Sequence, residues 1–101
     1  MKDKLLKIIN HYGVLSQLKY FQSEVFEFNE AVIDTEIYSS VYGEIEKYDT
    51  DHITEEIADI LVMLKQFQLY YEISNEDIKS IMNKKIDRQI ERINNDTTNN
   101  I

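Results

Sequence analysis

Apolar residues recur every three or four positions through most of this chain. One such series consists of Leu18, Phe21, Val25, Phe28 and Val32. Residues at this spacing lie on one face of an α-helix, because the helix turns once every 3.6 residues. The pattern therefore predicts a long amphipathic helix over roughly 16–38, with Ser16 as its N-cap.

Two further apolar series predict two more long helices. The first, over roughly 52–71, contains Ile53, Ile57, Ile60, Leu64, Phe67 and Tyr71. The second, after residue 74, contains Ile78, Met82, Ile86, Ile90 and Ile93. Thr50 or Asp51 is the predicted cap of the first, and Ser74 with Asp77 resembles a capping box for the second.

The remaining segments predict a short first helix, a loop and a tail. The first helix covers roughly 2–11 and ends at Gly13, a residue suited to a left-handed cap. Gly43 and the acidic stretch after it predict a loop over 39–51, with room for a short helical turn. Because the sequence has no proline and only two glycines, the predicted fold class is all-α, an antiparallel bundle of about four helices.

The length of the chain suits one small domain. We expect a single helical domain over 1–93 and a polar, disordered tail over 94–101. A domain of this size buries a smaller share of its surface than a larger one does. Oligomerisation is a common remedy for the marginal stability of such a domain, and the apolar-rich second helix argues against a monomer.

Composition and charge exclude several kinds of partner. Without cysteine there are no disulfides and no thiolate metal sites, which fits a cytoplasmic protein. A net charge of −8 argues against binding a nucleic-acid polymer. The start MKDKLLKIIN is too short and too charged for a signal peptide, and no later segment suits a bilayer, so no membrane partner is expected.

Two carboxylate pairs are the main candidates for chemistry. Glu24 and Glu27 lie three residues apart, as do Glu56 and Asp59, so each pair shares a helix face. On neighbouring antiparallel helices the pairs can form one cluster, which needs a cation to compensate its charge. Oxygen ligands favour Mg²⁺, Mn²⁺ or Ca²⁺ over zinc. Acidic pairs on solvated helix faces are common, but Glu56 lies at the edge of its apolar stripe, about 20° from Met63 in projection.

Basic residues gather on one flank of the last predicted helix. Lys85, Arg88 and Arg92 lie together in projection, and Lys85 falls within the apolar arc. Its stem can cover apolar surface while the amine reaches water. Alternatively, the cations can bind the phosphates of an anionic ligand.

Aromatic and histidine side chains give weaker signals. Tyr12 and Tyr20 are open candidates for stacking on a base, whereas Phe21 is assigned to the core. His11 and His52 lie near predicted helix ends and are not assigned as ligands.

Read with their surroundings, these motifs resemble the MazG-like all-α nucleoside triphosphate pyrophosphohydrolases. The segment QLKYFQSEVFEFNEAV (17–32) is similar to the first metal helix of that family, and HITEEIADILVMLKQF (52–67) to the second. The ending KIDRQIERI (85–93) is similar to the basic C-terminal helix of small phage and bacterial members.

The resemblance implies Mg²⁺, with Mn²⁺ as a substitute, and cleavage of a (deoxy)nucleoside triphosphate by water into a monophosphate and pyrophosphate. It also implies a homodimer or homotetramer in which the helical bundle is completed across the subunit interface. The site it implies has metal ligands Glu24, Glu27, Glu56 and Asp59, with Glu27 and Glu56 in catalysis and Lys85, Arg88 and Arg92 on the phosphates.

Two other functions remain open. Many members of the family carry two adjacent glutamates where this chain has Ser23 and Glu24. A catalytically weak or inactive helical module, which acts by binding a protein or nucleotide, is therefore the alternative. A purely structural helical oligomer is a third hypothesis, and it expects Glu56→Gln to be neutral or mildly stabilising.

Overall fold

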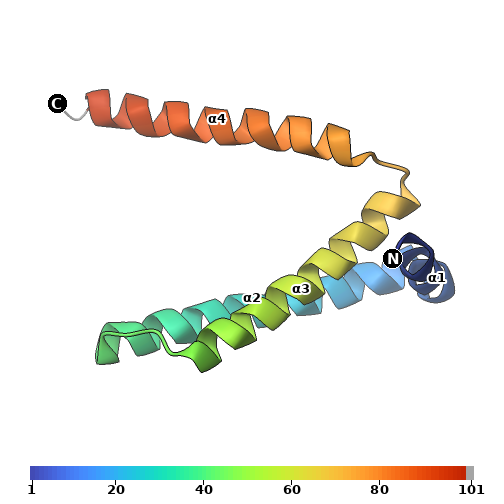
Figure 1. The fold of residues 1–101 in the computed structure, drawn as a ribbon, viewed down its shortest axis with the longest axis horizontal. Coiled ribbons are helices and arrows are strands. Elements are labelled where there is room, and N and C mark those ends of the chain that lie inside the picture. The colour runs from blue at the N-terminus through green and yellow to red at the C-terminus, as the bar shows by residue number, and fades with distance from the viewer. Residues whose placement is uncertain (100–101) are drawn as a thin grey trace. The chain divides into compact units, whose positions relative to one another are not determined.

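The computed structural model describes the backbone of residues 1–99 and the side chains of 1–96. Four helices account for nearly all of it: α1 (Lys2–Tyr12), α2 (Val14–Tyr42), α3 (Lys47–Tyr70) and α4 (Asn75–Asn99) (Figure 1). The predicted all-α fold with four helices is confirmed. None of the helices in the described part is both long and apolar enough to cross a membrane.

The chain divides into two compact units, Met1–Tyr71 and Glu72–Ile101. The first contains α1, α2 and α3, and the second contains α4. A single domain over 1–93 stays a prediction.

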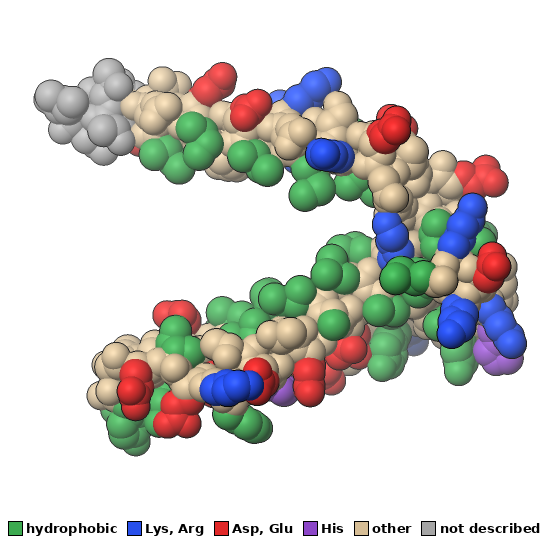
Figure 2. Space-filling view, viewed as in Figure 1, with side chains coloured by type: hydrophobic (Ala, Val, Ile, Leu, Met, Phe, Trp, Pro, Cys, Tyr) green, Lys and Arg blue, Asp and Glu red, His purple; other side chains and the backbone are tan. Residues whose placement is uncertain are grey.

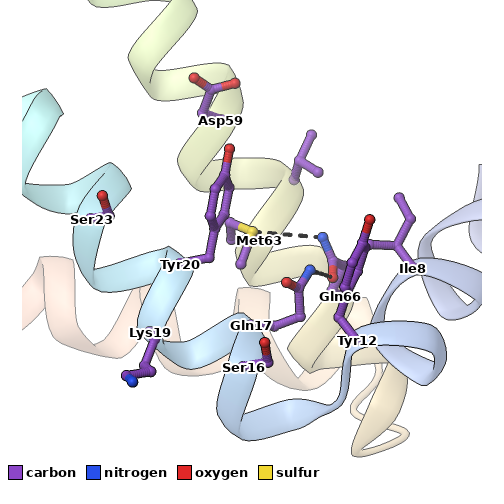
Figure 3. A pocket seen from close by; sticks show the side chains of 11 residues that line it. Ile8, Tyr12, Ser16, Gln17, Lys19, Tyr20, Ser23, Asp59, Met63 and Gln66 are labelled. Carbon is purple, nitrogen blue, oxygen red and sulfur yellow. Dashed lines mark hydrogen bonds between the residues drawn. The ribbon is translucent and has the colours of Figure 1, made fainter.

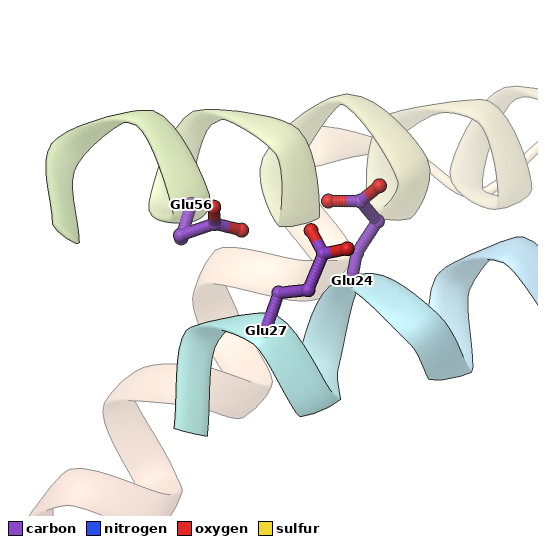
Figure 4. Close-up of side chains that lie close together, drawn as sticks. All are labelled: Glu24, Glu27 and Glu56. Carbon is purple, nitrogen blue, oxygen red and sulfur yellow. The ribbon is translucent and has the colours of Figure 1, made fainter. Parts of the chain in front are cut away.

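Within the first unit, α2 and α3 form an antiparallel hairpin. Gln17 near the start of α2 donates a hydrogen bond to Gln66 near the end of α3, with 2.7 Å between Nε2 and Oε1. Further along α2, Glu27 lies beside Glu56, which precedes Gln66 on α3 (Figure 4). Helix α1 packs against both, and it supplies the buried side chains Leu5 and Ile9.

A single residue separates α1 from α2. The Gly13 N–H donates to the carbonyl of Ile9 at 2.8 Å and ends α1, while the Gly13 carbonyl accepts from Gln17 N–H at 3.0 Å and starts α2. Gly13 has φ 90° and ψ 153°, so the expected left-handed helical cap is wrong, although φ is positive. The predicted N-cap at Ser16 is also wrong, because α2 begins before it and no side chain caps it.

The connection between α2 and α3 is much shorter than the predicted loop over 39–51, which is wrong. Helix α2 continues because the hydroxyls of Ser39 and Ser40 bond to carbonyls three residues back instead of breaking the helix. It ends at Gly43, which is left-handed at φ 78° and ψ 5°. The Tyr38 hydroxyl then donates to Glu46 Oε1 at 2.8 Å and ties the four-residue connection to α2.

The ends of α3 and α4 test the remaining boundary predictions. Thr50 and Asp51 lie inside α3, so their predicted capping role is wrong. Ser74 is confirmed as a cap, because its Oγ accepts a hydrogen bond from Asp77 N–H at 3.0 Å. Helix α4 continues to Asn99. Part of the predicted tail is therefore helical, and residues 100–101 lie outside the described residues.

The contact between α2 and α3 is largely polar. Its buried residues are Gln17, Glu24, Ala31 and Thr35 on α2, and Glu56, Met63 and Gln66 on α3. Several are spaced by seven, the repeat that keeps one face of a helix against its neighbour. We call this contact the seam. The two apolar series of the first unit supply none of the buried residues of the seam.

The predicted apolar series flank the seam instead. Phe21 and Phe67 make an edge-to-face contact with 6.0 Å between ring centroids, and both are half-buried. Leu18, Ile57 and Leu64 remain substantially exposed. In projection they fall to the same side of the hairpin. Hydrophobic side chains are visible along α3 and along α4 in Figure 2.

Truncation of Ile9 tests how much the small core contributes. Ile9 is fully buried between α1 and the hairpin, so Ile9→Ala leaves a cavity and should lower the free energy of unfolding by about 2–5 kcal/mol. Urea denaturation followed by circular dichroism measures this. Ile8→Ala, at a partly exposed neighbour, is the control and should cost much less. Equal losses would contradict the assignment of the core.

Candidate functional site

Three carboxylates converge where α2 faces α3. Glu24 and Glu27 come from α2 and Glu56 from α3, and one oxygen of each lies within 4.8 Å of the others (Figure 4). Glu24 is 5% exposed and Glu56 7% exposed, while Glu27 is exposed to solvent. The arrangement has two buried acids and one accessible acid.

The sequence builds this cluster through the register of the seam. Glu24 lies midway between Gln17 and Ala31, seven residues from each, so it must share their buried face. Glu56 precedes buried Met63 by the same interval. Glu27 lies three residues after Glu24, at the edge of that face, where it stays in contact with water.

The two buried acids are incompletely satisfied. Glu24 Oε2 and Glu56 Oε2 are both buried and have no hydrogen-bond partner among the described residues. A buried, unpaired carboxylate oxygen is costly. On its other side, Glu24 accepts a hydrogen bond from the Tyr20 hydroxyl. Glu56 Oε1 lies 3.9 Å from His52 Nε2, an ion pair only when the histidine is protonated.

The electrostatics of the cluster favour a cation. Burial raises the pKa of Glu24 above its ordinary value, and the charges of Asp59 and Glu27 raise it further. The Tyr20 hydroxyl opposes this by donating to the carboxylate. A set of carboxylate oxygens with unused lone pairs suits a hard divalent ion such as Mg²⁺. The residues present therefore fit a metal of that class.

The fourth predicted ligand lies close by. Asp59 is exposed and is not one of the three converging acids, but it is within hydrogen-bonding reach of Glu24 when one of the two is protonated. Lys85, Arg88 and Arg92 are exposed on α4, in the second unit. Their role toward phosphate stays a prediction.

A pocket of about 780 Å³ adjoins the cluster (Figure 3). Tyr20 and Asp59 line it on the side of Glu24, and Ser23 lies at the same edge. Tyr12, an open candidate for stacking on a base, also lines the pocket. The whole pocket belongs to the first unit.

Three residues of the site were missed from the sequence. Gln17 and Gln66 are buried at one end of the seam and line the pocket. The seven-residue spacing of Gln17, Glu24 and Ala31 was the signal that could have indicated the burial of Gln17. His52 precedes Glu56 by one helical turn, the spacing at which helical side chains meet.

Comparison of this chain with protein-family models, with curated proteins and with solved structures found no match.

The raised pKa of Glu24 gives a pH-dependent prediction. A carboxyl whose pKa is higher in the folded state stabilises that state below the unfolded pKa of about 4.5, and this stability is lost as pH rises through the folded pKa. Without metal, Glu24→Gln should therefore match wild type in acid and become the more stable protein as pH rises to about 7.

Thermal unfolding in chelator, measured between about pH 4 and 7, tests this difference. Glu30→Gln, at an exposed position on the same helix, is the control and should follow the wild-type pH dependence. A stability difference for Glu24→Gln that does not change with pH would contradict the prediction.

Proposed function

We propose that this protein is a Mg²⁺-dependent nucleoside triphosphate pyrophosphohydrolase of the MazG-like type. The observation that supports the proposal is the pair of buried, unpartnered carboxylate oxygens of Glu24 and Glu56 beside the exposed Glu27. A solvated acidic surface would not bury such groups. A cytoplasmic location fits the absence of cysteine.

Glu24, Glu27, Glu56 and Asp59 are the residues that would hold the metal. When bound, Mg²⁺ would bind phosphate oxygens and lower the pKa of its bound water. The buried acids are held by the helix packing around them, so their carboxylates are preorganised. Glu27 differs because it reaches solvent and can exchange protons with it.

The reaction assigns each group a task. The oxygen of a water molecule forms a bond to the α-phosphorus while Glu27 accepts its proton. The bond between the α-phosphorus and the bridging oxygen breaks, and pyrophosphate leaves with the electron pair. Lys85, Arg88 and Arg92 would neutralise the phosphate charge. Because the protein is acidic overall, with net charge −8, a polyphosphate needs such cations to approach.

The proposal includes a homodimer or homotetramer. Leu18, Ile57 and Leu64, which flank the seam in the first unit, are exposed, as are Ile81, Met82, Ile86, Ile90 and Ile93 on α4. A lone helix cannot bury its own apolar stripe, and large exposed patches mark interaction surfaces. A second copy that covers the side with Ile57 and Leu64 would complete the bundle.

The competing candidate is an inactive module that binds a nucleotide or protein. Ser23 supports it, because this position lies at the edge of the pocket without the second acid that many family members have. The two candidates differ in whether the bound ligand is turned over.

Pyrophosphate release distinguishes them. With Mg²⁺, the wild type should release pyrophosphate from at least one member of a panel of canonical and modified nucleoside triphosphates, and chelator should stop it. Glu56→Gln should lower the rate at least about 100-fold, the scale of catalytic groups. Glu55→Gln, at the exposed neighbouring position, is the control and should retain activity. If the wild type releases no pyrophosphate from any nucleotide of the panel, the inactive module is favoured.

The oligomer is tested by sedimentation. Leu64→Asp adds a charge to the exposed apolar side of α3, and a desolvated charge in an interface is costly. It should shift the protein to monomers. Thr54→Asp is the control, since Thr54 is exposed and its hydroxyl bonds only to the Thr50 carbonyl of the same helix. A monomeric wild type would contradict this part of the proposal.

A further inference from the structure

The pocket beside the acidic cluster has a polar floor. Gln66 is 1% exposed and Gln17 is similarly buried, yet both line the pocket. Their side chains share the 2.7 Å hydrogen bond, and Gln66 Nε2 lies 3.7 Å from Met63 Sδ. Sulfur is a weak acceptor. The seam therefore buries two amide side chains at a position where apolar side chains would need no hydrogen-bond partners.

The amide pair keeps capacity for a ligand. A primary amide has two N–H donors and an oxygen with two lone pairs. The bond between Gln17 and Gln66 uses one donor of the first and one lone pair of the second. The pair can still offer both donors and acceptors to a molecule in the pocket. A purely hydrocarbon ligand would leave these groups unpaired, which is unfavourable.

Two tyrosines stand on either side of this floor. Figure 3 shows Tyr12 beside the Gln17–Gln66 pair and Tyr20 beside Met63. Tyr12 is 60% exposed and Tyr20 is comparably exposed. Tyr12 makes an edge-to-face contact with its neighbour His11 at 4.7 Å between ring centroids, and the Tyr20 hydroxyl donates to Glu24. Exposed aromatic rings suit stacking on a flat ligand.

We propose that this pocket binds the nucleobase of the substrate, with Tyr12 and Tyr20 against its faces and Gln17 and Gln66 on its polar edge. The inference rests on the proposed function, and it names the residues that determine which base is accepted. Tyr20 connects pocket and cluster, because it lines the former and bonds to Glu24 in the latter. A base in the pocket would have its phosphates directed toward the carboxylates.

Two kinds of variant separate the role of the tyrosine ring from that of the two amides. Tyr12→Ala removes a ring, and Tyr12→Phe keeps the ring as the matched control. The double variant Gln17→Met with Gln66→Met removes both amides together, because replacement of one alone would strand the other. Tyr12 is exposed, so its variants keep the test valid even where the double variant fails to fold.

Equilibrium dialysis with AMP, GMP, CMP and UMP in Mg²⁺ measures base binding without hydrolysis, and ribose 5-phosphate serves as the probe without a base. We expect at least one nucleotide to bind about tenfold more tightly than ribose 5-phosphate. Tyr12→Ala should remove most of that gain and Tyr12→Phe should keep it. The double variant should reduce the differences among the four bases to about threefold or less.

The inference is overturned where Tyr12→Ala and the double variant bind the four nucleotides with wild-type affinities and preferences. It is also overturned where ribose 5-phosphate binds as well as every nucleotide. Pyrophosphate release measured on the same variants keeps the two proposals apart. Turnover with no change in base preference overturns the base pocket alone, and base-dependent binding without turnover overturns the enzyme assignment alone.

Discussion

The antiparallel contact of α2 with α3 determines nearly everything else in the first unit. Its register is fixed at one end by the hydrogen bond between Gln17 and Gln66. The same register brings Glu27 beside Glu56 and places Glu24 between them and the pocket. A shift of one helical turn would separate the three acids. The contact that folds the hairpin is therefore also the contact that assembles the site.

This arrangement limits the stability of the first unit. A seam of glutamines and glutamates buries little apolar area, and hydrophobic burial is the main favourable contribution to folding. The buried apolar residues among the described side chains are few, namely Leu5, Ile9, Ala31 and Met63. The apolar area that the seam does not use lies on the outside, where only another surface can cover it. A metal in the cluster and a second copy on the apolar side would each compensate part of this deficit.

The sequence predicted the helices better than it predicted their ends. Long apolar periodicity is a strong signal, and all four helices exist. Ser39 and Ser40 looked like loop residues, but their hydroxyls bond back to the helix. The position of Gly43 was a sound signal for a break, whereas the acidic stretch after it was not, because α3 absorbs most of it.

Part of the candidate site was predictable because its acids follow a local helical spacing. Pairs of acids three residues apart were visible, and three of the four acids do converge. The burial of Gln17 and Gln66 does not follow from the sequence, because apolar periodicity favours the apolar series as the inner face of each helix. Their pairing depends on which faces of two separate helices meet. Local periodicity does not contain that information when a helix has apolar residues on more than one face.

Gly13 has a consequence for how this protein can diversify. It alone joins α1 to α2, and Tyr12 in the pocket wall is its neighbour in sequence. One pair of backbone angles therefore sets the direction in which α1 leaves α2, and with it the width of the pocket. The acids lie beyond this junction, on α2 and α3. A change at this one joint can therefore alter the width of the pocket while the acidic cluster stays unchanged.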